Sequence, residues 1–325
     1  MTITYHDFTH LEPFIKNYKG KLTEGITYNP SNNTLLWVDI IKGEIHRVIL
    51  TKDDKGERSY SNHQHFVIPN ETIGVIYLTT NDDIVLVGSQ FGIAEYHFSS
   101  EKFQYKLRYD SQDVFKSSDG TYKLRSNDGG VDSNGNIWQG LMGNFTIGPI
   151  DDGSLVKITP NGDFKKVEKS LIPNGINWSK DGKTLYWTSS LELTIYKFDY
   201  DPINQEISNK TPFINFKQVF PDFDSPEPDG FTLNSKDEIY TVVWSTSSVV
   251  HFNTNGEVIE IFKLPTNRVS CCFFGPDNEL FINTANINLE NDEPNDDLGG
   301  SIFRLKIDDE GITKNKLKYP FQNIF

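Results

Sequence analysis

The chain has 325 residues, with 31 Lys and Arg against 45 Asp and Glu, and a formal net charge of −14 at pH 7. This acidic balance, without a basic stripe, argues against a nucleic acid or an anionic membrane as partner. No stretch approaches the roughly 18 apolar residues of a membrane-spanning helix, and the N-terminus lacks the features of a secretory signal. The two cysteines, Cys271 and Cys272, are adjacent, which disfavours a disulfide between them, so we expect reduced thiols and a cytoplasmic protein.

Short apolar runs follow turn sequences rich in Asn, Asp and Gly along the whole chain, which is the pattern of β-hairpins. Their first apolar residues are Leu35, Ile84, Ile137, Leu185, Ile239 and Leu280. These positions are separated by 49, 53, 48, 54 and 41 residues, and such a period indicates a repeat protein.

Each repeat has a second apolar run upstream, entered through a small residue, and a third one downstream. The upstream runs read EGITY, IGVIY, DGGVD, NGINW, DGFTL and RVSCCF. Because there is room for a fourth strand between repeats, each repeat of about 50 residues matches one four-stranded propeller blade. The sequence therefore predicts an all-β protein, a six-bladed β-propeller that forms a single domain over residues 1–325. We expect the N-terminal segment to help close the ring.

Three polar segments lie outside this strand pattern. Loops at residues 142–152 and 285–298 follow the second strand of their repeats, so they are expected on one face of the propeller. We interpret the acidic loop as solvated, because DEPNDD lacks the spacing and glycine of an EF-hand. The segment His63-Gln64-His65 offers metal ligands, but it lies in a polar connection and we interpret it as solvated as well.

Oxygen-bearing side chains recur just before the glycine that opens the upstream strands. In the first five repeats these positions hold Glu24, Ile73, Asp128, Asn174 and Asp229. Each Asp-Gly or Asn-Gly pair alone also marks a turn. In a propeller, however, equivalent inner positions point at one axis, and converging carboxylates and amides suit a hard divalent cation such as Ca²⁺, Mg²⁺ or Mn²⁺. The shared register favours a metal site.

The chain resembles the SMP-30/gluconolactonase/LRE family, which includes regucalcin, over about residues 20–306. The stretches that carry the resemblance include EGITYNPSNNTLLWVDIIKGEIHR, LRSNDGGVDSNGNIWQGLMG, PNGINWSKDGKTLYWTSS and PDGFTLNSKDEIYTVVW. The resemblance implies a six-bladed propeller with one divalent metal ion, Ca²⁺ before Mg²⁺, Mn²⁺, Zn²⁺ or Fe²⁺. It also implies hydrolysis of a small-molecule sugar lactone by a protein that we expect to be monomeric.

The resemblance implies metal-binding, proton-transfer and substrate-contacting roles for particular residues. Glu24, Asn174 and Asp229 match the family's metal ligands, and Asp229 also matches its proton donor and acceptor. Arg125, Asn127 and Asp128 match the substrate-contacting Arg-x-Asn-Asp-Gly motif. The chain departs from the family at Ser189 and Ser190, where Asp-Ser is common, and its loop at residues 142–152 contains no Glu. Both departures concern the identity of the substrate rather than the metal ligands.

Three other functions remain open at this point. A regucalcin-like Ca²⁺-binding regulatory protein without significant catalysis would keep the metal ligands but would not need Arg125 and Asn127. A hydrolase of other esters or phosphotriesters would keep the whole set. A propeller that serves as a scaffold for protein partners would need no central acids. The retained Arg-x-Asn-Asp motif favours a lactonase.

Overall fold

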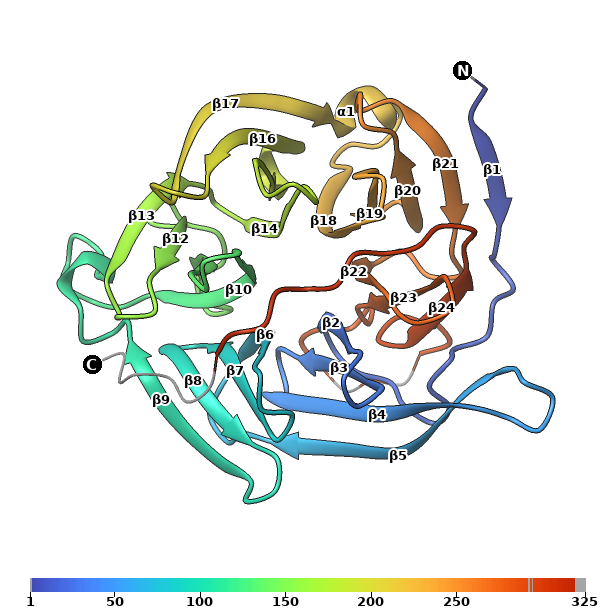
Figure 1. The fold of residues 1–325 in the computed structure, drawn as a ribbon, viewed down its shortest axis with the longest axis horizontal. Coiled ribbons are helices and arrows are strands. Elements are labelled where there is room, and N and C mark those ends of the chain that lie inside the picture. The colour runs from blue at the N-terminus through green and yellow to red at the C-terminus, as the bar shows by residue number, and fades with distance from the viewer. Residues whose placement is uncertain (1, 292, 294, 319–325) are drawn as a thin grey trace. The chain divides into compact units, whose positions relative to one another are not determined.

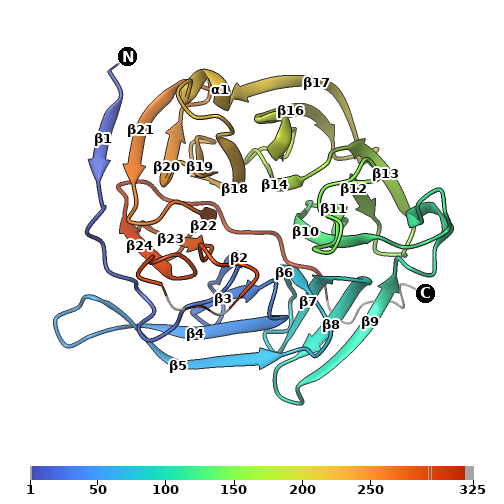
Figure 2. The same cartoon turned by 180° about the vertical axis from the view of Figure 1, so that it is seen from behind.

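The computed structural model describes residues 2–291, 293 and 295–318 of the chain. Its contacts divide the chain into two compact units, Met1–Pro69 with Asn215–Thr313 and Asn70–Ile214 with Lys314–Phe325. The strands of the described residues form six sheets, and each sheet takes its strands from one segment of the sequence, apart from the added strand β1 (Figures 1 and 2). The prediction of a single domain over residues 1–325 stays a prediction.

The first unit contains the first, fifth and sixth sheets, whose strands pair in antiparallel order. The first sheet consists of β2 (Thr23–Asn29), β3 (Thr34–Asp39), β4 (Glu44–Lys52) and β5 (Arg58–Val67). The fifth consists of β18 (Glu227–Leu233), β19 (Ile239–Trp244), β20 (Ser248–Phe252) and β21 (Val258–Lys263), and it follows the short helix α1 (Phe216–Val219). The sixth consists of β22 (Val269–Phe274), β23 (Glu279–Thr284) and β24 (Ile302–Lys306).

The second unit contains the other three sheets. The second sheet consists of β6 (Ile73–Leu78), β7 (Ile84–Ser89), β8 (Gly92–His97) and β9 (Lys102–Arg108). The third consists of β10 (Leu124–Val131), β11 (Ile137–Gly143), β12 (Ser154–Ile158) and β13 (Phe164–Lys169). The fourth consists of β14 (Pro173–Trp178), β15 (Thr184–Ser189), β16 (Thr194–Asp201) and β17 (Glu206–Asn215). The 3-10 turn Asp113–Phe115 lies between β9 and β10, and the 3-10 turn Ser190–Glu192 lies between β15 and β16. All the strand runs quoted from the sequence are therefore present. Five of the six sheets also have the fourth strand that a four-stranded blade requires, whereas the described residues give the sixth sheet three strands.

The N-terminal segment runs along the fifth and sixth sheets of the first unit. Its strand β1 (Thr4–Asp7) pairs in parallel with β21 at the edge of the fifth sheet. Further on, the backbone N–H of Phe14 donates to Ile302 at 2.7 Å, and Leu22 forms a bridge with Ala285. These bonds attach the segment to the sixth sheet.

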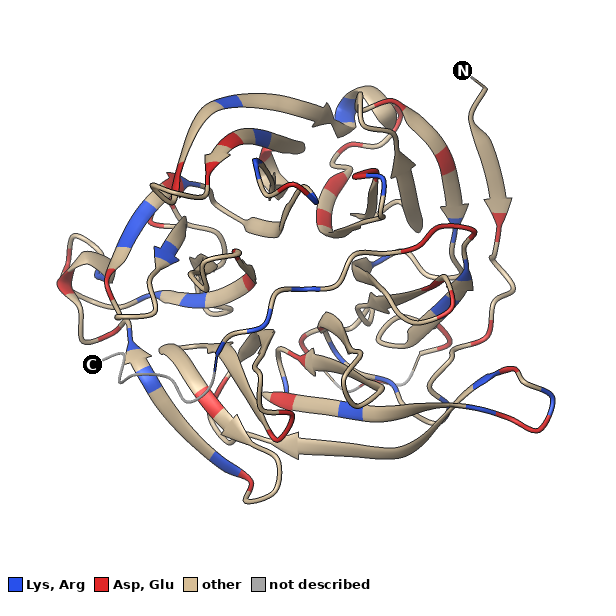
Figure 3. Cartoon of the chain, in the orientation of Figure 1, with Lys and Arg blue, Asp and Glu red and all other residues tan. Residues whose placement is uncertain are grey.

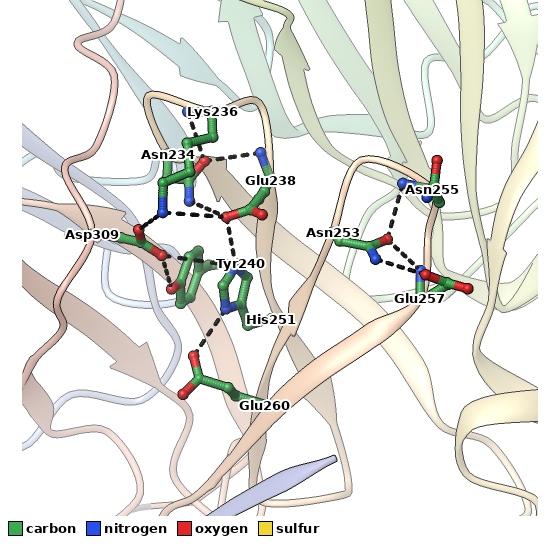
Figure 4. Close-up of polar contacts among 10 residues, drawn as sticks. All are labelled: Asn234, Lys236, Glu238, Tyr240, His251, Asn253, Asn255, Glu257, Glu260 and Asp309. Carbon is green, nitrogen blue, oxygen red and sulfur yellow. Dashed lines mark hydrogen bonds and ion pairs between the residues drawn. The ribbon is translucent and has the colours of Figure 1, made fainter. Parts of the chain in front are cut away.

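The turns repeat one hydrogen-bonded pattern, which explains why Asn and Asp mark them in the sequence. In four of them, a side-chain oxygen at the first turn position accepts the backbone N–H groups two and four residues later. Asn234 accepts from Lys236 and Glu238 at 3.0 and 2.9 Å, as Figure 4 shows. The turns at Asp53, Asp132 and Asn253 have the same pair of bonds.

Apolar side chains pack between neighbouring sheets. In the second unit, Val75, Tyr77 and Leu86 join Leu141 and Val156 in one buried cluster. Related clusters fill the spaces between the other neighbouring sheets of each unit. This packing places the first strands of neighbouring sheets side by side. In the second unit β10 lies between β6 and β14, and in the first unit β22 lies between β18 and β2.

Charged residues of both signs are interspersed along the strands and turns of both units (Figure 3). In the described residues, no helix is long and apolar enough to cross a membrane.

Candidate functional site

The predicted metal ligands occupy one equivalent position in the first strands of their sheets. Glu24 lies four residues before Tyr28, which pairs with Leu35, the first apolar residue of the next strand. Asn174 lies four residues before Trp178, the partner of Leu185. Asp229 lies four residues before Leu233, which pairs with Ile239. We call this position the row position.

A bulge interrupts the pairing at or next to the row position. In β14, Pro173 and Ile176 are consecutive paired residues, so that Asn174 and Gly175 together oppose Thr188. In β18, Asp229 and Gly230 lie in the same way between the paired residues Pro228 and Phe231. A bulge leaves residues outside the ladder and redirects their side chains, which is why bulges are common beside active sites.

The register corrects the sequence alignment in the third sheet. Ser126 and Gly129 are consecutive paired residues of β10, so Asn127 and Asp128 form its bulge. Asn127 is four residues before Val131, the partner of Ile137, and therefore holds the row position. Asp128 takes the place of Gly175 and Gly230. The alignment by sequence was one residue off because it took the residue before the first glycine of each strand. In β10 that glycine is Gly129, which stands one position later than Gly175 and Gly230 do in their strands.

The row-position asparagines of the second unit belong to one chain of hydrogen bonds. The Nη1 of Arg125 donates to Asn127 Oδ1 at 3.0 Å and to the Ser126 carbonyl at 2.9 Å. The Nδ2 of Asn127 donates to Asn174 Oδ1 at 3.2 Å, and the Nδ2 of Asn174 donates to Ser190 Oγ at 3.0 Å. The structure thus brings together Arg125, Asn127 and Asn174, and it adds Ser190, which the sequence suggested only as a departure from the family.

The loop at residues 144–152 contacts this chain of hydrogen bonds through the aromatic ring of Phe145. The guanidinium of Arg125 lies 4.3 Å from the ring centroid of Phe145, within the range of a cation–π contact. Arg125 is only 3% exposed, whereas Phe145 is 46% exposed. The sequence analysis did not single out Phe145, and an exposed aromatic residue in a loop is the signal that could have identified it.

Asp128 is buried next to Asn127, a member of the same chain of hydrogen bonds. Burial raises the pKa of this carboxyl, and the positive charge of Lys314 together with a hydrogen bond from the Gly129 N–H opposes part of that rise. The Gly129 N–H lies 2.7 Å from Asp128 Oδ1. A buried carboxyl of raised pKa is a frequent feature of functional sites.

The first unit holds the two carboxylates of the predicted metal site. Glu24 is 6% exposed and its Oε2 accepts the Gly25 N–H at 3.0 Å, while Asp229 is 8% exposed. A Cβ atom on Gly230 would lie 2.6 Å from the Cys271 Sγ, so only glycine fits after Asp229. The Asp-Gly pair is therefore required by packing between β18 and β22, not only by a turn.

The chemistry of this donor set fits a hard divalent cation. Glu24 and Asp229 offer carboxylate oxygens, and Asn174 offers its amide oxygen Oδ1, which also accepts the bond from Asn127. Burying carboxylates is costly without compensating positive charge, and Ca²⁺ prefers oxygen ligands of these types.

A second polar cluster in the first unit combines Glu238, His251 and Asp309, whose ligand atoms lie within 4.8 Å of one another (Figure 4). These groups could hold a metal ion, but they also bind other side chains. Lys236 Nζ lies 2.6 Å from Asp309 Oδ1, and the Tyr240 hydroxyl donates to Asp309 Oδ2 at 2.6 Å.

His251 is enclosed in this cluster. Its Nδ1 lies 2.9 Å from Glu260 Oε2, its Nε2 lies 3.2 Å from Glu238 Oε2, and its ring stacks on Tyr240. Burial disfavours ionisation of Asp309, yet the bonds from Lys236 and Tyr240 outweigh it and hold the pKa of Asp309 below its ordinary value. Because a metal ion would have to displace these bonds, we assign the cluster to fold stability.

Comparison with known proteins relates the chain to one family. The model of the SMP-30/Gluconolactonase/LRE-like region matches residues 22–286. The chain is 38% identical over 327 residues to a cell growth-regulated gene 1 protein of Candida albicans, covering 93% of this chain and 95% of that protein. It is 27% identical over 299 residues to a pentonolactonase of Haloferax volcanii, covering 88% and 91%.

Solved structures show the fold. The crystal structure of a calcium-binding protein, regucalcin, from Agrobacterium tumefaciens matches with a TM-score of 0.79 at 21% identity, covering 99% of this chain and all of that one. The prediction of an all-β, six-bladed β-propeller is confirmed by this likeness and by the six sheets of the described residues.

Proposed function

The chain belongs to the SMP-30/Gluconolactonase/LRE-like family, and on that premise we propose that it is a metal-dependent hydrolase that opens sugar lactones. The observation that carries the proposal is the buried hydrogen-bond chain from Arg125 through Asn127 to Asn174, which joins the motif for substrate to a row position. The name of the Haloferax relative, a pentonolactonase, supports the same substrate class.

We assign Glu24, Asn174 and Asp229 as the ligands of one divalent cation, with Ca²⁺ as the first candidate and Mg²⁺, Mn²⁺, Zn²⁺ or Fe²⁺ after it. Such an ion, when bound, polarises a carbonyl group and stabilises the negative charge that develops on its oxygen. Three protein ligands leave coordination positions for small molecules.

The protein's own residues bind the substrate and move a proton. Arg125 and Asn127 offer directional donors to the hydroxyl groups of a sugar lactone, and Asp128 lies beside them. Asp229 accepts a proton from the attacking water and returns it to the ring oxygen when the ester C–O bond breaks. Water and lactone thereby give one hydroxy acid. Phe145 covers one face of the Arg125 guanidinium and is part of the loop that adjoins the substrate.

Two rival functions make different predictions. A Ca²⁺-binding regulatory protein without significant catalysis would need the ligand set alone, so the buried Arg125–Asn127 bond favours an enzyme. A hydrolase of other esters or phosphotriesters would share every assigned residue, and only its substrates distinguish it. We retain a small-molecule lactone as the partner. A monomeric state, a cytoplasmic location and the lack of nucleic-acid or membrane partners stay predictions.

The test measures the hydrolysis of a panel of five- and six-carbon aldonolactones by titrating the acid released at constant pH. Metal-stripped protein is assayed before and after each cation is added, with Glu24→Gln as the ligand variant. We expect hydrolysis only with metal and a strong loss in the variant. Tight metal binding without hydrolysis of any lactone or ester would favour the regulatory protein, and full activity after stripping would contradict the metal dependence.

A further inference from the structure

The outer ribbon of the first sheet gathers four potential metal ligands on one face. Glu44 and His46 alternate along β4, and His63 and His65 alternate along β5. Residues two apart on a strand share a face, and the pairing sets His46 directly opposite His65. The segment that we interpreted from sequence as a solvated connection is therefore part of a strand, and its histidines face a third one.

The contacts of His46 orient one of its nitrogens toward His63. The His46 Nε2 lies 3.0 Å from Glu44 Oε2, and because a carboxylate accepts hydrogen bonds, this nitrogen carries the proton. Nδ1 then keeps its lone pair, and it lies 3.2 Å from His63 Nε2. A carboxylate that fixes a histidine tautomer in this way is the usual outer partner of a metal-bound imidazole.

Aromatic rings hold His46 in place. Its ring stacks on Trp37 at 5.1 Å with an interplanar angle of 5°, and the ring of His65 lies 5.8 Å away, also stacked. The Tyr18 hydroxyl is 3.4 Å from His46 Nε2. His46 is 2% exposed, whereas His63 and His65 are exposed, so the open side of the cluster faces solvent. An ion could enter from that side without any movement of the buried ring.

We propose that His46, His63 and His65 form a binding site for a borderline-soft divalent ion such as Zn²⁺ or Ni²⁺, with Glu44 as the partner that orients His46. Two nitrogens bound to one tetrahedral ion at about 2.0–2.1 Å lie roughly 3.3–3.4 Å apart, close to the observed His46–His63 spacing. No nitrogen of His65 lies within 4.8 Å of both His46 Nδ1 and His63 Nε2, so the exposed side chain of His65, opposite His46 in the ladder, has to rotate to complete the site. Nitrogen ligands separate this site from the all-oxygen set assigned to the hard cation.

The experiment uses the full chain without an affinity tag, stripped of metal and then saturated with Ca²⁺. Zn²⁺ and Ni²⁺ are titrated by calorimetry, and Ni²⁺ quenching of Trp37 fluorescence gives a second readout. The variants are the double variant His63→Ala/His65→Ala, whose side chains are exposed, and Glu44→Gln. The matched control is His97→Ala, because Glu95 and His97 on β8 repeat the Glu-x-His spacing without cross-strand histidines.

We expect the double variant to bind Zn²⁺ at this site at least 100-fold more weakly than wild type. At concentrations that saturate wild type, wild type should therefore bind one Zn²⁺ more than the double variant. Glu44→Gln should weaken binding about 10- to 100-fold, as loss of a second-shell partner does. His97→Ala should bind like wild type. Equal Zn²⁺ stoichiometry and affinity in wild type and the double variant would overturn the site, and the cluster would then be an aromatic and hydrogen-bonded contact only. Melting temperatures measured without metal show whether each variant is folded.

Discussion

Replacing Arg125 by alanine tests whether the buried hydrogen-bond chain serves substrate binding. Arg125 donates to Ser126 and Asn127 and lies against the Phe145 ring. Loss of a charged hydrogen bond to the substrate costs about 1.5–3 kcal/mol, or about 10- to 150-fold in kcat/KM. Metal affinity should stay near that of wild type, because Arg125 is not an assigned ligand. Arg125→Lys should recover only part of the loss, since an ammonium cannot reproduce the planar fork.

The same substitution also weakens the fold, and the two effects can be separated. The lost charged bond and cation–π contact together cost about 2–4 kcal/mol. With an unfolding entropy of about 2.1 cal/mol/K per residue, this lowers Tm by roughly 3–6 °C. The protein therefore remains folded at 25 °C, where lactone hydrolysis and metal affinity by calorimetry are measured on the same preparation.

Arg47 provides the matched control. Its Nε donates to Gln64 Oε1 at 2.8 Å and its guanidinium lies 5.7 Å from the Phe66 centroid, so it makes the same kinds of contact outside the candidate site. Arg47→Ala should lower Tm and leave kcat/KM unchanged. If Arg125→Ala behaves in the same way, with kcat/KM within twofold of wild type, Arg125 only packs against its neighbours and the reasoning is wrong.

Other variants test separate parts of the structure. Asp229→Asn should lower turnover about 10²- to 10⁴-fold with little change in Tm; wild-type turnover would reject Asp229 as the base. Asp309 has a lowered pKa in the fold, so its stabilising contribution is complete above its ordinary value of 3.8 and is lost as pH falls through the folded value. The Tm difference between wild type and Asp309→Asn should therefore shrink below about pH 4 in calorimetry, and a constant difference would contradict this. Asp132→Ala should cost about 3–5 kcal/mol, seen in urea unfolding, because the carboxylate accepts from Trp138 at 2.9 Å and Tyr200 at 2.7 Å; a loss below about 1 kcal/mol would show that these bonds contribute little.

The repeating strand pattern was predictable because it is a local property. Leu35, Ile137 and Leu185 are the first or second residues of strands that follow Asn- or Asp-containing turns, and the turn and the apolar run lie within a few residues of each other. The propeller follows from the number and spacing of these runs. Glu24, Asn174 and Asp229 were likewise found at equivalent positions, because each stands directly before a glycine of its first strand.

The exact register depended on tertiary structure. The sequence alone aligned Asp128 with the metal ligands, but the ladder between β10 and β11 places Asn127 there, because the position of a bulge is set by pairing with a partner strand. The contact between Phe145 and Arg125 joins a loop to a strand, and no local pattern encodes it.

The histidine cluster shows the same division. Sequence alone identified His63 and His65 as a His-x-His segment and interpreted it as solvated, and both side chains are exposed in the structure. His46 lies 17 residues before His63, and only the pairing of β4 with β5 brings the two nitrogens to 3.2 Å. Composition and period thus determined the class of fold and the residue types available for chemistry. Which of those residues meet was decided by strand pairing, because contacts between residues distant in sequence depend on the packed chain as a whole.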